Sequence, residues 1–323
     1  MIGSEWRDRR GVVTYQRWGR FKVAIDGDSS VRISDAFLNC VGFIGEVAVE
    51  GPSGVQGDLC GTGFFVSVET NGPVRHSYFV TARHVRNTFN GGKFFILVNK
   101  KGGGVLAIQG GDELWWDHPN DNAADVSVIR IDETSEMDVS HIGSSDLATL
   151  EMLRKHDFGI GDDVFVIGLF SFAPGEKQNM PIVRHGNIAM LPNEQLQTEL
   201  GFTDAYLIEA RSIGGLSGSP VFVRKTVMIR TRRVDGEEIE QFDSFLSGAG
   251  GSLCLGLAQG HWDVKESKIN SPGVMHDQHG VNMGIAIVVP AFKILETLNR
   301  TELVNDRADR DAKFVAERLP RMD

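Results

Sequence analysis

The chain has 323 residues, a formal net charge of −10 and an isoelectric point near 5.4. At about 100 to 200 residues per domain this length predicts two folding units, and the acidic charge argues against broad nucleic-acid binding because a polyanion favours a basic surface. The first residues lack the apolar run of a signal peptide, and no stretch approaches the roughly 18 apolar residues of a membrane helix. We therefore expect a soluble, cytoplasmic protein that binds neither nucleic acid nor membrane.

Short apolar or alternating segments recur along the chain between clusters of glycine and turn residues. This spacing favours antiparallel barrels or sandwiches over strand–helix–strand units, and 38 glycines suit the corners of coiled barrels. The sequence thus predicts an all-β fold. We expect strands within residues 41–49, 63–68, 78–81, 93–98, 126–131, 164–168, 205–209 and 253–257.

Helical patterns are few. A helical turn is expected after Ala82, and residues 145–153 have the pattern of a short connecting helix. The charged tail, residues 305–323, is predicted to be a solvated helix or a frayed end rather than an element that binds a partner. A C-terminal helix docked on the second unit is predicted after Pro290, because apolar residues recur there at helical spacing: Phe292, Ile294, Leu295 and Leu298.

Three short segments carry candidate catalytic side chains, in the order His84, Asp125 and Ser217. A hydroxyl nucleophile needs an imidazole to take its proton and a carboxylate to fix the tautomer of that imidazole. An α/β-hydrolase would place the histidine last and a helix after the serine, whereas here residues 220–223 continue as a β-rich run. Asp125 is the preferred acid because an apolar strand follows it directly; Asp117 and Asp121 are the alternatives.

At these residues the sequence resembles the trypsin-like, chymotrypsin-fold serine peptidases, especially their bacterial Deg-type, high-temperature-requirement branch. Residues 81–85, Thr-Ala-Arg-His-Val, are similar to the family's T-A-A-H-V, and residues 125–129, Asp-Val-Ser-Val-Ile, to D-I-A-V-L. Residues 215–220, Gly-Leu-Ser-Gly-Ser-Pro, are similar to G-N-S-G-G-P. The likeness extends to residues 61–65, 160–168 and 283–287, and we expect no PDZ module after the catalytic domain.

The resemblance implies a chymotrypsin-like architecture of two six-stranded antiparallel β-barrels with a C-terminal helix and an active site at the barrel interface. The expected divisions of the chain are an N-terminal extension, a first barrel, a linker, a second barrel and a C-terminal helical extension: residues 1–34, 35–145, 146–157, 158–290 and 291–323.

The resemblance also implies site roles. Ser217 would be the nucleophile, His84 the general base and then the general acid, and Asp125 the orienting acid, with the N–H groups of Gly215 and Ser217 forming the oxyanion hole. Ser219 replaces the last glycine of the family motif, a departure that bears on packing beneath the nucleophile. Leu216 replaces the aspartate that pairs with a new N-terminus in many secreted relatives, so we expect no zymogen activation through that ion pair.

The resemblance further implies which residues line the primary specificity pocket: Arg211, Ser212, Ala258, Gln259, Gly260 and Ala286. An inward Arg211 would attract an acidic substrate side chain. An outward Arg211 is favoured, because a buried unpaired guanidinium is costly.

Two insertions distinguish the second half of the chain. Residues 223–250 are interpreted as an extended hairpin and residues 261–280 as a long polar loop, and each is either a specificity element or surface decoration. His276 and His279 lie in the second insertion without further convincing ligands, so the sequence predicts neither a metal site nor a cofactor. The three cysteines, Cys40, Cys60 and Cys254, are too sparse and odd in number for a disulfide framework.

The function predicted from these features is that of a serine endopeptidase, which hydrolyses peptide bonds of protein substrates through an acyl-enzyme. The expected partners are a protein or peptide substrate and a regulatory or activating protein. The alternative hypothesis is a catalytically silent or latent trypsin-like module that acts as a protein-binding scaffold.

Overall fold

The first half of the chain folds around one large sheet. In the computed structural model, the described residues are 33–51, 54–89, 92–111, 115–210, 215–224, 228–234, 237–243, 252–264 and 281–318. The sheet has eight strands in the order β5-β4-β1-β2-β3-β7-β6, with β8 paired to β2. The strands are β1 (Val41–Gly51), β2 (Gly54–Val68), β3 (His76–Thr81), β4 (Phe94–Asn99), β5 (Val105–Gly110), β6 (Trp115–Asp117), β7 (Ser127–Ile131) and β8 (Ile142–Gly143).

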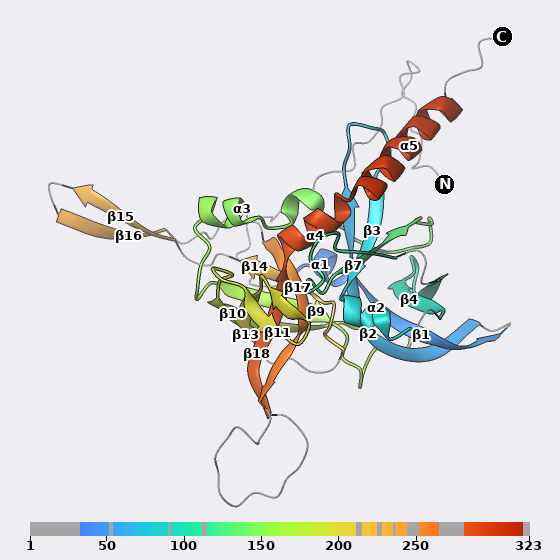
Figure 1. The fold of residues 1–323 in the computed structure, drawn as a ribbon, viewed down its shortest axis with the longest axis horizontal. Helices are drawn as coiled ribbons and strands as arrows, with labels where there is room; N and C mark the ends of the chain where they lie inside the picture. Colours follow the sequence, from blue (N-terminus) through green and yellow to red (C-terminus); the bar gives the residue numbers. More distant parts are fainter. Residues whose placement is uncertain are drawn as a thin grey trace, which may run out of the picture.

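The second half forms a closed barrel of antiparallel strands in the order β10-β13-β18-β17-β14-β9 (Figure 1). Two separate hairpins, β11 with β12 and β15 with β16, accompany it. The strands are β9 (Asp163–Gly168), β10 (Ile182–Met190), β11 (Leu196–Thr198), β12 (Gly201–Thr203), β13 (Tyr206–Glu209), β14 (Pro220–Arg224), β15 (Met228–Val234), β16 (Glu237–Asp243), β17 (Leu253–Val264) and β18 (Val281–Pro290).

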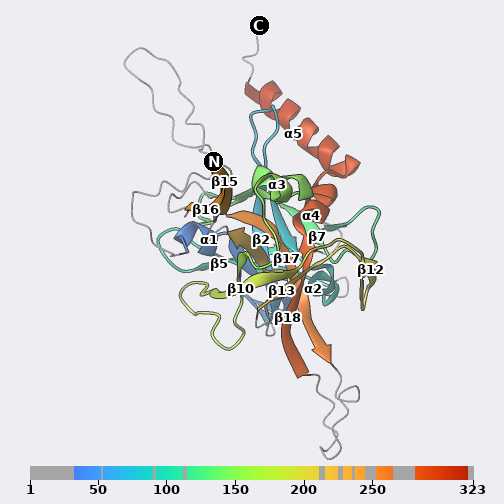
Figure 2. The same ribbon diagram turned by 90° about the vertical axis from the view of Figure 1, so that its left-hand side faces the viewer.

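The helices are short except for the last one, α5. It rises above the sheets and follows α4, which lies close to both halves (Figures 1 and 2). The helical segments are α1 (Asp35–Leu38), α2 (Arg83–Asn87), η2 (Ser144–Asp146), α3 (Leu150–Lys155), α4 (Ala291–Leu298) and α5 (Thr301–Arg318).

The predicted fold class is confirmed: the chain is mostly β-strand, with a closed six-stranded barrel and a C-terminal helix. The first sheet differs in detail from the expected six strands, because it has eight, one of them the parallel strand β8. Tight coiling in this sheet depends on glycine. A Cβ on Gly63 would lie 2.3 Å from the ring of Phe79, so only glycine leaves room for that ring.

The hydrophobic core is continuous between the two halves. One buried cluster joins Phe64 and Phe79 of the first sheet to Phe165 and Phe222 of the barrel. Phe37 of α1 packs edge-on against the last two rings, at centroid distances of 5.4 and 4.8 Å. A second cluster, which includes Val166 and Val288 among its members, fills the barrel interior. The shared cluster gives the two halves a fixed relation, which the site between them requires.

The docked helix predicted after Pro290 is confirmed as α4, and residues 305–318 of the tail form most of α5, a helix that is largely exposed but has buried residues on one side. Ile294 and Leu298 of α4 and Leu303 of α5 belong to the core cluster that the two halves share. Arg307 of α5 is also buried, and it donates hydrogen bonds to the hydroxyl of Tyr78 (3.1 Å) and to the carbonyl of Leu298 (2.9 Å). The alternative of a frayed end does not hold for residues 305–318, because charged side chains of α5 pair with the first sheet, as in the 2.9 Å contact between Asp306 and Arg130.

The two insertions also have defined parts. Residues 228–243 contain an antiparallel hairpin that projects away from the barrel, which confirms the predicted extended hairpin (Figure 1). Residues 261–264 were predicted as loop but continue β17, because His261 pairs with Ala286 and Val264 with Val281 of β18. Residues 265–280, including His276 and His279, lie outside the described residues. The helix expected at residues 145–153 is divided into η2 and α3, since Thr149 caps α3 by accepting a hydrogen bond from the N–H of Met152 (3.2 Å).

Within the described part of the chain, no helix combines the length and the apolar character needed to cross a membrane. All three cysteines are free.

Candidate functional site

His84 lies in the first turn of α2, directly after β3. Ala82 at the N-cap position offers no side-chain acceptor to the helix. The carboxylate of Asp125 takes this place, because its Oδ1 accepts the backbone N–H of His84 at 2.8 Å. The same acid therefore caps the helix that carries the histidine and fixes its backbone.

The other oxygen of Asp125 holds the imidazole. Nδ1 of His84 lies 2.6 Å from Oδ2 of Asp125, whose side chain is fully buried while that of His84 is 41% exposed. A carboxylate is an acceptor, so the shared proton is on Nδ1, and in the neutral ring Nε2 is then the nitrogen that can accept a proton. This is the tautomer that a general base requires.

The two alternative acids have other partners. Oδ2 of Asp117 lies 2.6 Å from Arg86, and its Oδ1 accepts a hydrogen bond from Ser127. Asp121 accepts the N–H groups of Ala123 and Ala124 and pairs with Lys293. Among these three acids, Asp125 is the one in contact with His84.

Ser217 lies in a tight turn that is tied to the first sheet. Gly215 and Gly218 have φ values of 95° and 84°, a region that favours glycine. The Thr62 hydroxyl donates to the carbonyl of Gly215 at 2.7 Å, and the N–H of Thr62 donates to the carbonyl of Ser217 at 2.9 Å. On the other side, the N–H of Gly218 donates to the carbonyl of Ala258 at 2.8 Å. Both halves of the fold therefore hold the turn.

The turn packs against the histidine helix. A Cβ on Gly61 would lie 3.0 Å from both the Ser217 carbonyl oxygen and the methyl groups of Val85, the residue after His84. A Cβ on Gly218 would lie 3.1 Å from the backbone nitrogen of Ala82. The folded chain thus brings the segments of Ser217 and His84 together.

The hydroxyl of Ser217 donates to the carbonyl of Gln259 at 3.2 Å, and no hydrogen bond joins it to His84 in the described structure. The N–H groups of Gly215 and Ser217 donate to no other described residue, whereas that of Ser219 is used within the turn, to the carbonyl of Leu216 (3.0 Å). These two N–H groups are the predicted oxyanion donors. The catalytic roles of all these residues stay predictions.

Ser219, the departure from the family motif, is fully buried, and its hydroxyl has no hydrogen-bond partner among the described residues. It fits because Gly168 lies opposite: a Cβ on Gly168 would be 1.9 Å from the Ser219 oxygen. Leu216 is also buried, with 2% of its surface exposed. An apolar side chain there is held by packing, and no acid is present at this position to bind an ammonium group.

The expected pocket residues are only partly described. Arg211 and Ser212 lie outside the described residues. Ala258 and Ala286 are buried in the core cluster of the barrel, whereas Gln259 and Gly260 are half-buried. A Cβ on Gly260 would meet no atom within 4 Å, so the space beside it is open. The roles of these residues in substrate binding stay predictions.

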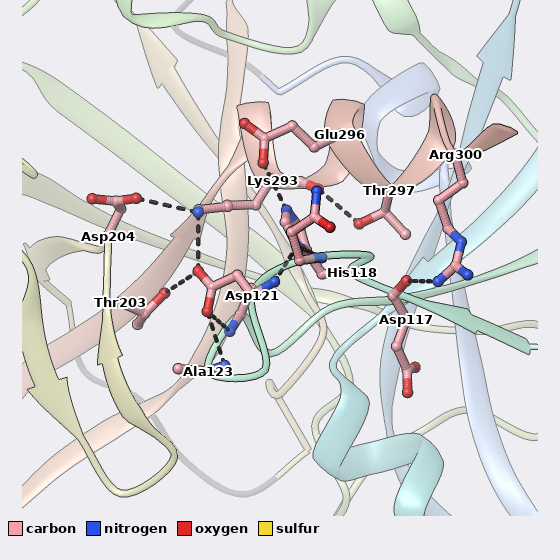
Figure 3. Close-up of polar contacts among 12 residues, drawn as sticks. Asp117, His118, Asp121, Ala123, Thr203, Asp204, Lys293, Glu296, Thr297 and Arg300 are labelled. Atoms are coloured by element: carbon pink, nitrogen blue, oxygen red, sulfur yellow. Dashed lines mark hydrogen bonds and ion pairs between the residues drawn. The ribbon is translucent and has the colours of Figure 1, made fainter.

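Sequence reasoning missed two groups of supporting residues. The first is the Thr62 hydroxyl, which lay within the noted 61–65 motif but gave no local sign of its partner. The second is a polar cluster between α4 and the loop before Asp125 (Figure 3). Its main members are His118, Asp121, Lys293, Glu296 and Arg300. In the described residues, no group of histidine, cysteine and acidic side chains is arranged to hold a metal ion.

Comparisons with known proteins identify the family of the chain. A family model described as the trypsin-like peptidase domain matches residues 61–229. Among solved structures, the chain is similar to the protease domain of MamO from Magnetospirillum magneticum in its apo form, with 16% identity and a TM-score of 0.40 over 64% of this chain and 92% of that one. No curated protein matches. Because the family model covers more than half of the 323 residues, the chain belongs to the trypsin-like peptidase domain family.

Proposed function

We propose that the protein is a serine endopeptidase in which Ser217, His84 and Asp125 form the catalytic triad. The observation that carries the proposal is the 2.6 Å contact between Nδ1 of His84 and the buried carboxylate of Asp125. It supports an imidazole with Nε2 free to accept a proton, next to a glycine-flanked serine turn.

In the proposed reaction, Oγ of Ser217 attacks the scissile carbonyl carbon while its proton passes to Nε2 of His84. The N–H groups of Gly215 and Ser217 stabilise the negative oxygen of the tetrahedral intermediate. His84 then donates the proton to the leaving amine, which departs as the C–N bond breaks. Water, deprotonated by His84, attacks the acyl-enzyme and releases the carboxylic acid and the free serine.

The alternative is a latent or silent trypsin-like module. The hydrogen bond from the Ser217 hydroxyl to the Gln259 carbonyl favours a latent state, because the hydroxyl must rotate toward His84 before it can lose its proton. Free enzymes often have long catalytic hydrogen bonds that tighten with substrate, so the same observation is compatible with an active enzyme.

Peptidase activity on unfolded proteins and a peptide library tests the proposal, with the Ser217→Ala variant beside wild type. We expect turnover to fall by several orders of magnitude, about 10⁶-fold in a comparable triad. Ser145→Ala, in η2, is the matched control and should retain full activity. Equal turnover in wild type and Ser217→Ala would remove Ser217 from its role.

A fluorophosphonate probe separates the two functions. Labelling of Ser217, located by mass spectrometry of the labelled peptide, supports an activated nucleophile. If wild type is neither labelled nor active on any substrate, the scaffold or latent hypothesis is favoured.

A further inference from the structure

Helix α4 contacts the loop that carries Asp125, which we call the aspartate loop (residues 118–126, between β6 and β7). Lys293 and Glu296, one turn apart on α4, reach Asp121 and His118 at 2.9 and 2.7 Å. Arg300, just after the helix, donates to the carbonyl of Asp117 at 2.7 Å. Figure 3 shows these side chains directed from the helix toward the loop. The three contacts thus run from Asp117, the residue before the loop, to Asp121, four residues before Asp125.

Lys293 is the centre of this contact. Its ammonium lies 2.9 Å from Asp121 and 3.2 Å from Asp204, and only 8% of the residue is exposed. Burial by itself would lower the pKa of Lys293, but the hydrogen bonds with the two carboxylates raise it above its ordinary value. The group therefore stays charged, and a buried lysine with two acidic partners joins α4 to two loops.

Asp121 connects Lys293 to the turn that precedes Asp125. One oxygen, Oδ1, accepts the N–H groups of Ala123 at 2.9 Å and Ala124 at 3.1 Å, which shapes the turn directly before Asp125. The other oxygen receives Lys293 and the hydroxyl of Thr203 (3.3 Å). Burial alone would raise the pKa of Asp121, but the hydrogen bonds from Lys293 and Ala123 lower it below the usual value. An ionised acid thus organises the turn.

His118 fixes the backbone of the same residue. Its Nδ1 accepts the N–H of Asp121 at 3.0 Å, so the proton is on Nε2, which lies 2.7 Å from Glu296. Asp121 is therefore held through its side chain by Lys293 and through its backbone by His118, and both contacts lead to α4.

The helix that carries His84 holds the opposite side. Arg83 donates to the carbonyl of Asn122, and Arg86 pairs with Asp117 at 2.6 Å. The aspartate loop therefore lies between α2, which carries the base, and α4. A shift of the loop relative to α2 would change the 2.6 Å contact between Asp125 and His84.

We propose that α4 positions the catalytic acid, with Lys293 as a positioning residue that acts on Asp125 through Asp121. The effect on catalysis rests on the proposed peptidase function, but the effect on the Asp125–His84 hydrogen bond does not. Loss of the Lys293 charge would leave Asp121 and Asp204 as neighbouring unpaired acids, and the turn before Asp125 would relax away from His84.

Proton NMR of the full-length protein tests this directly. A proton in a short imidazole–carboxylate hydrogen bond resonates far downfield, and a His84→Ala variant assigns the signal by its loss. We expect Lys293→Met and Asp121→Asn to shift or abolish the signal. Lys313→Met, at a position in α5 whose side chain is 78% exposed, is the matched control and should leave the signal unchanged.

Turnover gives a second readout. If the protein is an active peptidase, kcat should fall by up to about 100-fold in Lys293→Met while KM changes little, since misplacement of a catalytic group acts on the chemical step. If wild type is inactive, the proposed function fails. The NMR signal alone then shows whether Lys293 positions Asp125 against His84.

Asp121→Asn keeps an oxygen for Ala123 and Ala124, so it tests the ion pair even if Lys293→Met does not fold. A folded Asp121→Asn protein with an unshifted signal overturns the proposal. Asp204→Asn retains the Lys293–Asp121 pair and should preserve the signal. If Asp204→Asn shifts the signal as much as Asp121→Asn does, Lys293 does not act on Asp125 through Asp121.

Discussion

The hydroxyl of Thr62 joins the first sheet to the nucleophile turn, because it donates a 2.7 Å hydrogen bond to the carbonyl of Gly215, 153 residues further along the chain. The same oxygen accepts the N–H of Leu169 at 2.8 Å. One buried hydroxyl therefore satisfies two backbone groups next to the predicted oxyanion donors and ties the halves of the fold together.

Thr62→Val should lower both stability and activity. Valine has the shape of threonine but leaves the Gly215 carbonyl and the Leu169 N–H unpaired, at about 1 to 3 kcal/mol for each group. Urea unfolding measures the stability, and kcat should fall by up to about 100-fold as the turn moves. Thr62→Ser keeps the hydroxyl and should therefore retain most of the unfolding free energy and most of the kcat of wild type. If Thr62→Val has the unfolding free energy and the kcat of wild type, the hydrogen bond has no such role.

Gly218→Ala should be more destabilising than its backbone angle alone implies. The φ of 84° costs a side chain roughly 1–2 kcal/mol. In addition, a Cβ would lie 2.0 Å from the carbonyl oxygen of Thr62. Gly102 has nearly the same φ, 85°, but open space around it, so Gly102→Ala reports the angle without the clash. The difference between the two variants in urea unfolding should be about 1–3 kcal/mol. If Gly218→Ala and Gly102→Ala lose the same unfolding free energy, the turn is not closely packed on Thr62.

The free energy of unfolding should decrease in mild acid because of His76, which lies between the first sheet and α5. His76 is fully buried, and its Nε2 lies 3.4 Å from Asp311 of α5. Burial lowers the pKa of His76 more than Asp311 raises it. Between this lowered value and about 6.5, the ordinary pKa of histidine, the unfolded chain binds more protons than the folded one, so the free energy of unfolding decreases as the pH falls through this window.

A His76→Gln variant removes this titration. Its unfolding free energy, followed by thermal or urea melts from pH 8 to pH 5, should depend less on pH than that of wild type. The other histidines contribute equally to both proteins, so the difference between the curves isolates His76. Parallel curves would show that His76 is not the acid-sensitive group.

The cysteines should differ sharply in reactivity. Burial raises the pKa of Cys254 to about 12 and that of Cys40 far above its ordinary value, whereas Cys60 is only half-buried. Because the thiolate is the reactive form, a disulfide reagent at neutral pH should modify Cys60 rapidly in the native protein and all three cysteines after unfolding. Cys60→Ser should lose the rapid phase. Rapid modification of Cys40 or Cys254 in the native protein would contradict their burial.

The strand pattern and the order of His84, Asp125 and Ser217 could be predicted because each depends on a few neighbouring residues. Alternation of apolar residues specifies strands such as β3 and β7, and the glycines at positions 215 and 218, around Ser217, specify a tight turn. The solvated helix of the tail could be predicted for the same reason, because charge is also a local property. The contacts of Arg307 with Tyr78 and of Asp306 with Arg130 could not, because their partners lie in a distant part of the chain.

The amino-acid sequence is therefore enough to predict the local features of the protein: an all-β chain in which a histidine, an acid and a serine follow one another in three short segments. The sequence already favoured Asp125 over Asp117 and Asp121, but its 2.6 Å contact with His84 is visible only in the folded protein, as are the contacts of Thr62 and Lys293. A hydrogen bond requires two groups within about 3 Å in a particular orientation. Between residues far apart in the chain, that condition is met or missed only when strands and helices have packed together.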